Sequence, residues 1–122
     1  MASVFSELSP EQWLIESDHF FVIKDKYPVS PGHLLIVSKL HRHDFFELNG
    51  EEQNELTKLI SKAKTIIEQT HSPGGYNIGM NCGAAAGQTV FHFHCHVIPR
   101  YEGDVENPRG GIRNVMPGMG DY

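Results

Sequence analysis

Apolar and polar side chains alternate most clearly over residues 91–97, which read Phe-His-Phe-His-Cys-His-Val. A period of two residues is typical of a β-strand, whose successive side chains point to opposite faces of the sheet. The pattern therefore predicts a strand that presents His92, His94 and His96 together on one face. The apolar residues of this run would pack inward on the other face.

The rest of the chain contains further short apolar segments typical of strands, and one long segment with the period of a helix. A helical stripe with spacings of three and four residues predicts a helix from Asn49–Gly50 to about Gln69. Short apolar runs bounded by turn residues predict the strands. We expect these strands at residues 13–16, 19–23, 33–38 and 76–81, in addition to the histidine strand. The expected fold is α+β, with an antiparallel sheet of about five strands and one long helix across it.

The length of 122 residues is that of a single domain, with a core expected at about residues 12–101. Residues 102–122 are rich in Gly, Pro and Arg, so we expect an irregular C-terminal tail with one short strand at residues 112–116. No apolar run approaches the about 18 residues of a membrane span. The amino end lacks the pattern of a secretion signal, which favours a cytoplasmic protein without membrane contact.

The charge of the chain limits its partners. The net charge is −5 at pH 7, and long nucleic acid is an unsuitable partner because its binding depends on clustered Lys and Arg. A small nucleotide is not excluded in this way, because local potential decides its binding. Cys82 and Cys95 lack Cys-x-x-Cys spacing, and we expect both to be reduced thiols.

Three imidazoles in a row have two chemical uses. They can attack and stabilise a phosphoryl group, since imidazole changes its protonation near neutral pH. They could also bind zinc. The zinc interpretation is weaker, because positions i, i+2 and i+4 of one strand converge poorly on a single ion. The small residues 82–87 precede the strand, and such loops allow backbone N–H groups to approach an anion. We therefore expect no metal ion held by the protein.

The run His-Phe-His-Cys-His-Val-Ile, with Ala86-Gly87-Gln88-Thr89-Val90 before it and Pro99-Arg100 after it, resembles the histidine triad family. The flanks resemble the branch that contains the fragile histidine triad protein and the diadenosine polyphosphate hydrolases. The resemblance covers about residues 12–101. It implies a homodimer in which the sheet continues from one subunit into the other.

The resemblance also implies roles for residues near the histidines. His94 would be the nucleophile. His92 and His96 would stabilise the phosphoryl oxygens and the leaving group. Gln88 would assist them, and the phosphate would contact the segments that contain Asn81, Thr89 and Val90.

A second matching segment, a carboxylate followed by Pro-Gly-His before an apolar strand, implies the nucleoside site. Asp25 would bind the ribose hydroxyls, although an Asp here could also simply close a turn. His33 would support the triad from behind, and Phe20, Val22 and Ile23 would form an apolar pocket for the base. The chain departs from the family in two places. Asp25 stands where the fragile histidine triad protein has an amide, and residues 83–87 lack the acidic residue of many relatives.

The expected function is hydrolysis of a nucleoside polyphosphate, such as a diadenosine polyphosphate, at its α-phosphate through a nucleotidyl-histidine intermediate. Three alternatives remain open, namely an adenosine phosphoramidase, a nucleotidyltransferase, and a nucleotide-binding signalling module with little turnover. No cofactor bound by the protein is expected, but a divalent cation such as Mg²⁺ could arrive with the substrate.

Overall fold

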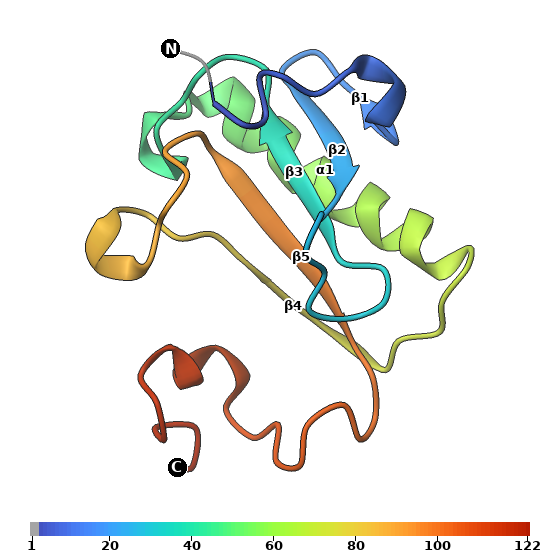
Figure 1. The fold of residues 1–122 in the computed structure, drawn as a ribbon, viewed down its shortest axis with the longest axis vertical. Helices are drawn as coiled ribbons and strands as arrows, with labels where there is room; N and C mark the ends of the chain where they lie inside the picture. The colour runs from blue at the N-terminus through green and yellow to red at the C-terminus, as the bar shows by residue number, and fades with distance from the viewer. Residues whose placement is uncertain (1–2) are drawn as a thin grey trace.

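The fold was analysed in a computed structural model that describes residues 3–122 (Figure 1). Five antiparallel strands form one sheet in the order β1-β2-β3-β5-β4. The strands are β1 (Ile15–Glu16), β2 (Phe20–Lys24), β3 (Leu34–Ser38), β4 (Gly75–Gly79) and β5 (His94–Arg100), and helix α1 spans Gly50–Glu68. The predicted α+β architecture is confirmed. Within residues 3–122, no helix has the length and apolar character needed to cross a bilayer.

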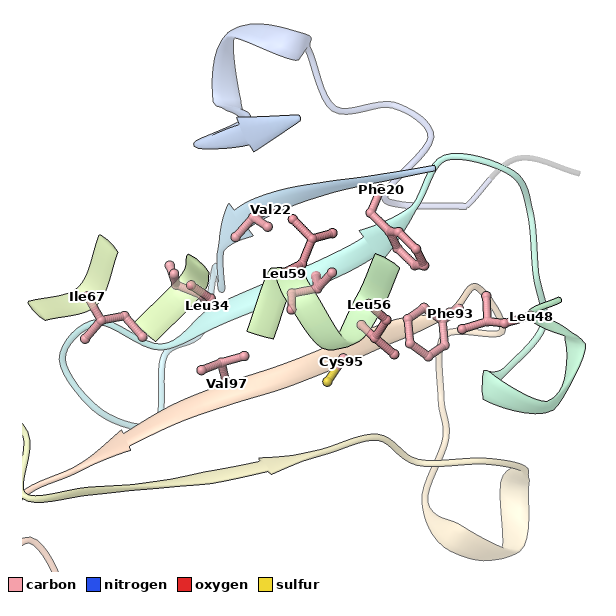
Figure 2. Packing of buried hydrophobic residues seen from close by; sticks show 12 residues of the cluster. Phe20, Val22, Leu34, Leu48, Leu56, Leu59, Ile67, Phe93, Cys95 and Val97 are labelled. Atoms are coloured by element: carbon pink, nitrogen blue, oxygen red, sulfur yellow. The ribbon is translucent and has the colours of Figure 1, made fainter. Parts of the chain in front are cut away.

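The two faces of the sheet carry different layers, and strand β5 shows the division. Cys95 and Val97 point toward α1 and are fully buried, whereas His94, His96 and Ile98 point to the other face and are partly exposed. Figure 2 shows the helix side, where side chains of β2, β3 and β5 meet the buried stripe of α1. Period-two alternation thus separates the core from the face that carries the histidines.

Helix α1 begins and ends close to where the sequence places it. Asn49 is the N-cap, and its side chain accepts the backbone N–H of Glu52. Glu52 in turn accepts the N–H of Asn49, which completes a capping box. The helix buries Leu56, Leu59, Ala63 and Ile67 against the sheet, as the predicted stripe requires.

The other face of the sheet is partly covered by the N-terminal segment, which we define as residues 3–8. Phe5 belongs to the buried cluster on this face and Leu8 packs against it. The same cluster contains Phe21 of β2, on which the Trp13 ring stacks with centroids 4.4 Å apart. The predicted core of residues 12–101 did not include the N-terminal segment.

Three predicted strands differ in detail from the structure. The histidine strand begins at His94 and not at Phe91, and Trp13 precedes β1. Phe91 is 41% exposed and lies against the His43 ring, so it does not pack inward as predicted. In the tail, Gly111–Val115 form a 3₁₀ helix instead of a strand. Gly110 and Gly111 have positive φ angles there, which interrupt an extended chain.

A buried ion pair joins the start of α1 to the segment that leads out of β3. Glu52 is fully buried, and its carboxylate lies 3.1–3.2 Å from Nε and 3.1 Å from Nη2 of Arg42. The backbone carbonyl of Arg42 accepts the N–H of Phe93 at 2.6 Å. The helix N-terminus is thereby connected to the residue between His92 and His94.

Replacement of Glu52 by Ala should destabilise the protein by about 3 kcal/mol, because it leaves the guanidinium of Arg42 without its partner and removes one half of the capping box. Chemical denaturation followed by circular dichroism measures the change in the free energy of unfolding. Glu51→Ala is the matched control, since Glu51 lies in the same helical turn but is exposed. Equal losses from both variants would contradict a special role for the buried pair.

Candidate active site

His94 is the first residue of β5 and pairs with Val37 of β3. Its Nδ1 lies 2.8 Å from the backbone carbonyl oxygen of His92. A carbonyl oxygen only accepts, so Nδ1 carries the ring proton and donates it. In the neutral ring, Nε2 is then the unprotonated nitrogen with an available lone pair. His94 is partly exposed on the face opposite to α1.

His92 lies on the same side of the sheet as His94, where the Phe5 ring contacts both imidazoles, but it is covered there. It is 2% exposed, and both of its ring nitrogens have partners inside the protein. Nε2 donates to the carbonyl oxygen of Ser38 at 2.7 Å, and Nδ1 lies 2.7 Å from the hydroxyl of Ser3. Burial lowers the pKa of His92, and the nearby His41 and His94 act in the same direction. The imidazole is therefore neutral at pH 7.

The predicted alternation continues through His92, because Phe93 belongs to the core cluster on the helix side while the His92 ring contacts Phe5 of the opposite face. The regular pairing of β5 ends at His94, and Phe93 bonds instead to two different segments. Its N–H donates to Arg42, while its carbonyl accepts the N–H of Ser38. The His92 ring is enclosed by the N-terminal segment and by His41, whose ring lies 4.9 Å away. Its contact with phosphoryl oxygens stays a prediction, and its backbone carbonyl is the group that contacts His94.

His33 is hydrogen-bonded to His96, and its supporting role in the site stays a prediction. The Nδ1 of His33 accepts the N–H of Val29 at 3.2 Å, so the proton of this ring is on Nε2. That Nε2–H donates to Nδ1 of His96 at 2.9 Å. His96 therefore carries its own proton on Nε2.

The pKa shifts of these two rings agree with the assigned protonation. Burial lowers the pKa of His33, although Asp25 opposes this shift. Burial also lowers the pKa of His96 to about 4, and the neighbouring His94 and His33 add to the effect. Both rings are neutral at pH 7. His96 thus offers a hydrogen-bond donor, not a positive charge.

Asp25 lies beside this pair of rings at the end of β2. One carboxylate oxygen accepts the N–H of Tyr27 at 2.8 Å, which closes a turn. The other lies 3.3 Å from Nε2 of His33 and 3.9 Å from Nδ1 of His96. The side chain is 14% exposed. Asp25 therefore closes a turn, which is the alternative role that the sequence left open for it. It also lies next to the two histidines.

Asp25, His33 and His96 place their ligand atoms within 4.8 Å of one another, close enough for one metal ion. The hydrogen bond from Val29 argues against that use. A metal on Nε2 of His33 would leave the ring proton on Nδ1, where it would face the N–H of Val29. The arrangement fits a chain of hydrogen bonds between neutral rings better than a metal centre.

Gln88 is placed differently from the prediction. It is 4% exposed, and its Oε1 accepts the N–H of Gly83 at 2.7 Å. Its Nε2 donates to the carbonyl oxygens of His43 and Val90 at 2.7 and 3.2 Å. Both amide N–H groups, the only groups of Gln88 that could donate to a phosphate, are thus used to shape the loop. A direct contact of Gln88 with phosphate does not occur in this arrangement.

The loop that Gln88 shapes carries the other predicted phosphate contacts. Gly83 and Gly87 adopt positive φ angles of 96° and 91° at the two ends of a short 3₁₀ helix. Asn81 and Thr89 have exposed side chains at the borders of this loop, and Val90 is partly buried under the N-terminal segment. These three residues lie on the loop that leads into the histidine segment, and their contacts with phosphate remain predictions.

The predicted base pocket is wrong for two of its three residues. Phe20 and Val22 are fully buried beneath α1, on the far side of the sheet from His94 (Figure 2). Ile23 points to the histidine side, because neighbouring strand residues face opposite ways. A pocket on one face cannot include both Val22 and Ile23.

Sequence reasoning missed the N-terminal segment. The Phe5 ring lies 5.0 Å from the His94 ring and 5.6 Å from the His92 ring, centroid to centroid. Ile23 and Leu8 join Phe5 in the same apolar cluster. Residues 3–8 have no clear period, so the chain offered no local signal for this contact.

The comparisons agree with this geometry. Residues 7–103 match the HIT domain, and the chain therefore belongs to the histidine triad family. It is 38% identical to a HIT-like protein of Mycoplasma genitalium over 71% of this chain and 62% of that protein. It is 34% identical to an AP-4-A phosphorylase of Mycobacterium tuberculosis over 80% of this chain and 52% of that protein. The chain thus spans between half and two thirds of the length of these relatives.

Among solved structures, a HIT family protein from Bacillus subtilis superposes with a TM-score of 0.76 at 30% identity. The superposition covers 85% of this chain and 77% of the other. The family and the fold are therefore established together, and the reaction remains to be argued from the site.

Proposed function

We propose that this protein is a nucleotide hydrolase that cleaves a nucleoside polyphosphate, such as a diadenosine polyphosphate, at the α-phosphate. One observation carries the proposal. The Nδ1–H of His94 is held by the His92 carbonyl, so the lone pair of Nε2 lies on the accessible side of the ring. A neutral imidazole fixed in this tautomer is a competent nucleophile toward phosphorus.

The reaction proceeds in two displacements. Nε2 of His94 attacks the α-phosphorus, and the bond from phosphorus to the leaving-group oxygen breaks with its electron pair on that oxygen. The positive charge that develops on the imidazole is stabilised by the hydrogen bond from its Nδ1–H to the His92 carbonyl. The Nε2–H of His96 donates to the developing oxyanion. Water then attacks the phosphorus, loses a proton and displaces His94, which releases a nucleoside monophosphate.

The neighbouring residues fit the remainder of a nucleotide. Asp25 can accept hydrogen bonds from two ribose hydroxyls, since each carboxylate oxygen has more than one lone pair. Ile23, with Phe5 and Leu8 beside it, supplies apolar surface on the histidine side of the sheet. The loop around Gly83 and Gly87 provides a backbone that an anion can approach closely.

A nucleotidyltransferase is the second candidate, favoured by the name of the AP-4-A phosphorylase relative. Phosphate instead of water would then attack the intermediate on His94. An adenosine phosphoramidase would use the same groups on a P–N bond, and a binding module would form no intermediate. Turnover of diadenosine polyphosphate and of adenosine phosphoramidate, each with and without added phosphate, separates all four activities. A divalent cation would accompany the substrate.

Replacement of His94 by Asn should lower kcat by several orders of magnitude and leave nucleotide affinity within a few-fold. The amide keeps a polar side chain of similar reach but cannot form the phosphorus–nitrogen bond. The measurement is steady-state turnover together with labelling of the protein by a substrate labelled at its α-phosphate. Acid-sensitive, base-stable label is expected on the wild type only.

Label that persists in the Asn variant would show that His94 is not the nucleophile. A chelator arm tests metal chemistry in the same assay. The arm uses a substrate that needs no divalent ion of its own. If chelation abolishes wild-type turnover of that substrate, a metal-based mechanism replaces the nucleophile mechanism.

Replacement of Asp25 by Ala should raise KM for ribonucleotides roughly 10-fold or more, because two hydrogen bonds to the ribose are lost. Deoxyribonucleotides should be affected much less. KM for matched ribose and deoxyribose substrates is the measurement. Equal losses for the two sugars would assign Asp25 to the Tyr27 turn and the His33 contact alone.

We also propose a homodimer in which the sheet continues across the β4 edge. Strand β4 is the last strand of the sheet, and Ile78 on it is 41% exposed. An open edge and its apolar side chains favour pairing with a second copy. Light scattering at micromolar concentration should give the mass of a dimer, and a monomer mass would remove the proposal.

A further inference from the structure

The hydroxyl of Ser3 occupies an unusual position for a residue so near the chain terminus. Its oxygen lies 2.7 Å from Nδ1 of the buried His92, 89 residues away in the sequence. The same oxygen accepts the N–H of Phe5 at 3.2 Å and lies 3.4 Å from the Ser6 hydroxyl. Ser3 therefore connects the N-terminal segment to the histidine segment.

The direction of the Ser3–His92 bond follows from its neighbours. Nε2 of His92 must donate, because its partner is the Ser38 carbonyl. In the neutral ring, Nδ1 is then an acceptor. The Phe5 N–H already uses a lone pair of the Ser3 oxygen, which leaves the hydroxyl hydrogen free to point at the imidazole. Ser3 is the donor, and His92 has both ring nitrogens satisfied.

His92 transmits this bond to the reacting group. Its carbonyl accepts the Nδ1–H of His94 and so sets the tautomer and the ring plane of that residue. A rotation or a charge on the His92 ring would displace this carbonyl. Ser3 also places Phe5, whose ring lies 5.0 Å from the His94 ring. One hydroxyl thus acts on the nucleophile along two routes.

We propose that Ser3 is a positioning residue for the nucleophile, which holds His92 neutral and immobile so that the His92 carbonyl keeps His94 in its reactive tautomer. The proposal rests on the proposed function of His94. It assigns a role in the chemistry to Ser3, which precedes the residues 7–103 that match the family.

Two variants of equal shape isolate the hydroxyl, Ser3→Thr and Ser3→Val. Thr retains the donor and Val removes it at nearly the same volume. With Val, kcat should fall about tenfold while KM stays within about twofold, because Ser3 itself does not touch the substrate and Phe5 remains packed in its apolar cluster. With Thr, kcat should stay within about threefold of the wild type. Ser6→Ala is the control, since Ser6 contacts Ser3 but not His92.

The pH dependence distinguishes positioning from a merely structural role. Without the donor, Nδ1 of His92 is open to protonation, so the acid limb of the kcat profile should move to higher pH in the Val variant. The ionisable groups that influence His92 are His41 and His94, and both are unchanged in all variants. Ser3→Thr and Ser6→Ala should keep the wild-type profile.

Nitrogen-15 NMR of the His92 ring gives a readout that does not depend on turnover. In the wild type, the ring should remain in the Nε2–H form from pH 5 to pH 8. In the Val variant it should begin to titrate within that range. If the wild type shows no turnover, the proposed function fails, and the NMR result still decides the role of Ser3. Identical His92 spectra and identical kcat for Thr and Val would overturn the proposal.

Discussion

The pairing of β3 with β5 is the interaction on which the site depends. Val37 is opposite His94 and Leu35 is opposite His96, although about 60 residues separate the partners in sequence. The ladder places both histidines beside residues that a short apolar strand holds rigidly. Just beyond its end, the carbonyl of Ser38 accepts the ring proton of His92. Loss of the register by one residue would send every histidine to the helix side.

His92, His94 and His33 each owe the position of the ring proton to a backbone group of fixed polarity. Carbonyl oxygens of His92 and Ser38 select the tautomers of His94 and His92, and the N–H of Val29 selects that of His33. Backbone groups cannot change from acceptor to donor, so these assignments do not depend on side-chain rotation. The site is organised before a substrate arrives, which is the condition for effective electrostatic catalysis.

Much of the fold follows from local patterns in the sequence. The stripe on α1, its cap at Asn49 and the alternation along β5 predicted the helix, the sheet and the placement of His94 and His96. The alternation did not predict that His92 is buried, because the Ser3 and Phe5 side chains that cover its ring belong to a distant segment. A contact between distant segments has no periodic signature.

The predictions for the base pocket and for Gln88 failed for physical reasons. Phe20, Val22 and Ile23 were grouped by apolar character, whereas strand parity places Ile23 alone on the histidine side. Gln88 was assigned to the phosphate site by resemblance, but both of its amide N–H groups donate to the backbone carbonyls of His43 and Val90. The part played by Ser3 and Phe5 arises only when folding brings the N-terminal segment against His92 and His94.

The two cysteines differ sharply in chemical access. Cys95 lies between His94 and His96 in sequence but points into the core, and burial raises the pKa of its thiol to about 12. A protonated, enclosed thiol does not react with maleimides at neutral pH. Cys82 is the remaining thiol, and it is partly exposed at the start of the loop around Gly83 and Gly87. The native chain therefore accepts a single fluorophore at the border of the loop around Gly83 and Gly87, and a change at that loop can be followed optically without introducing a mutation.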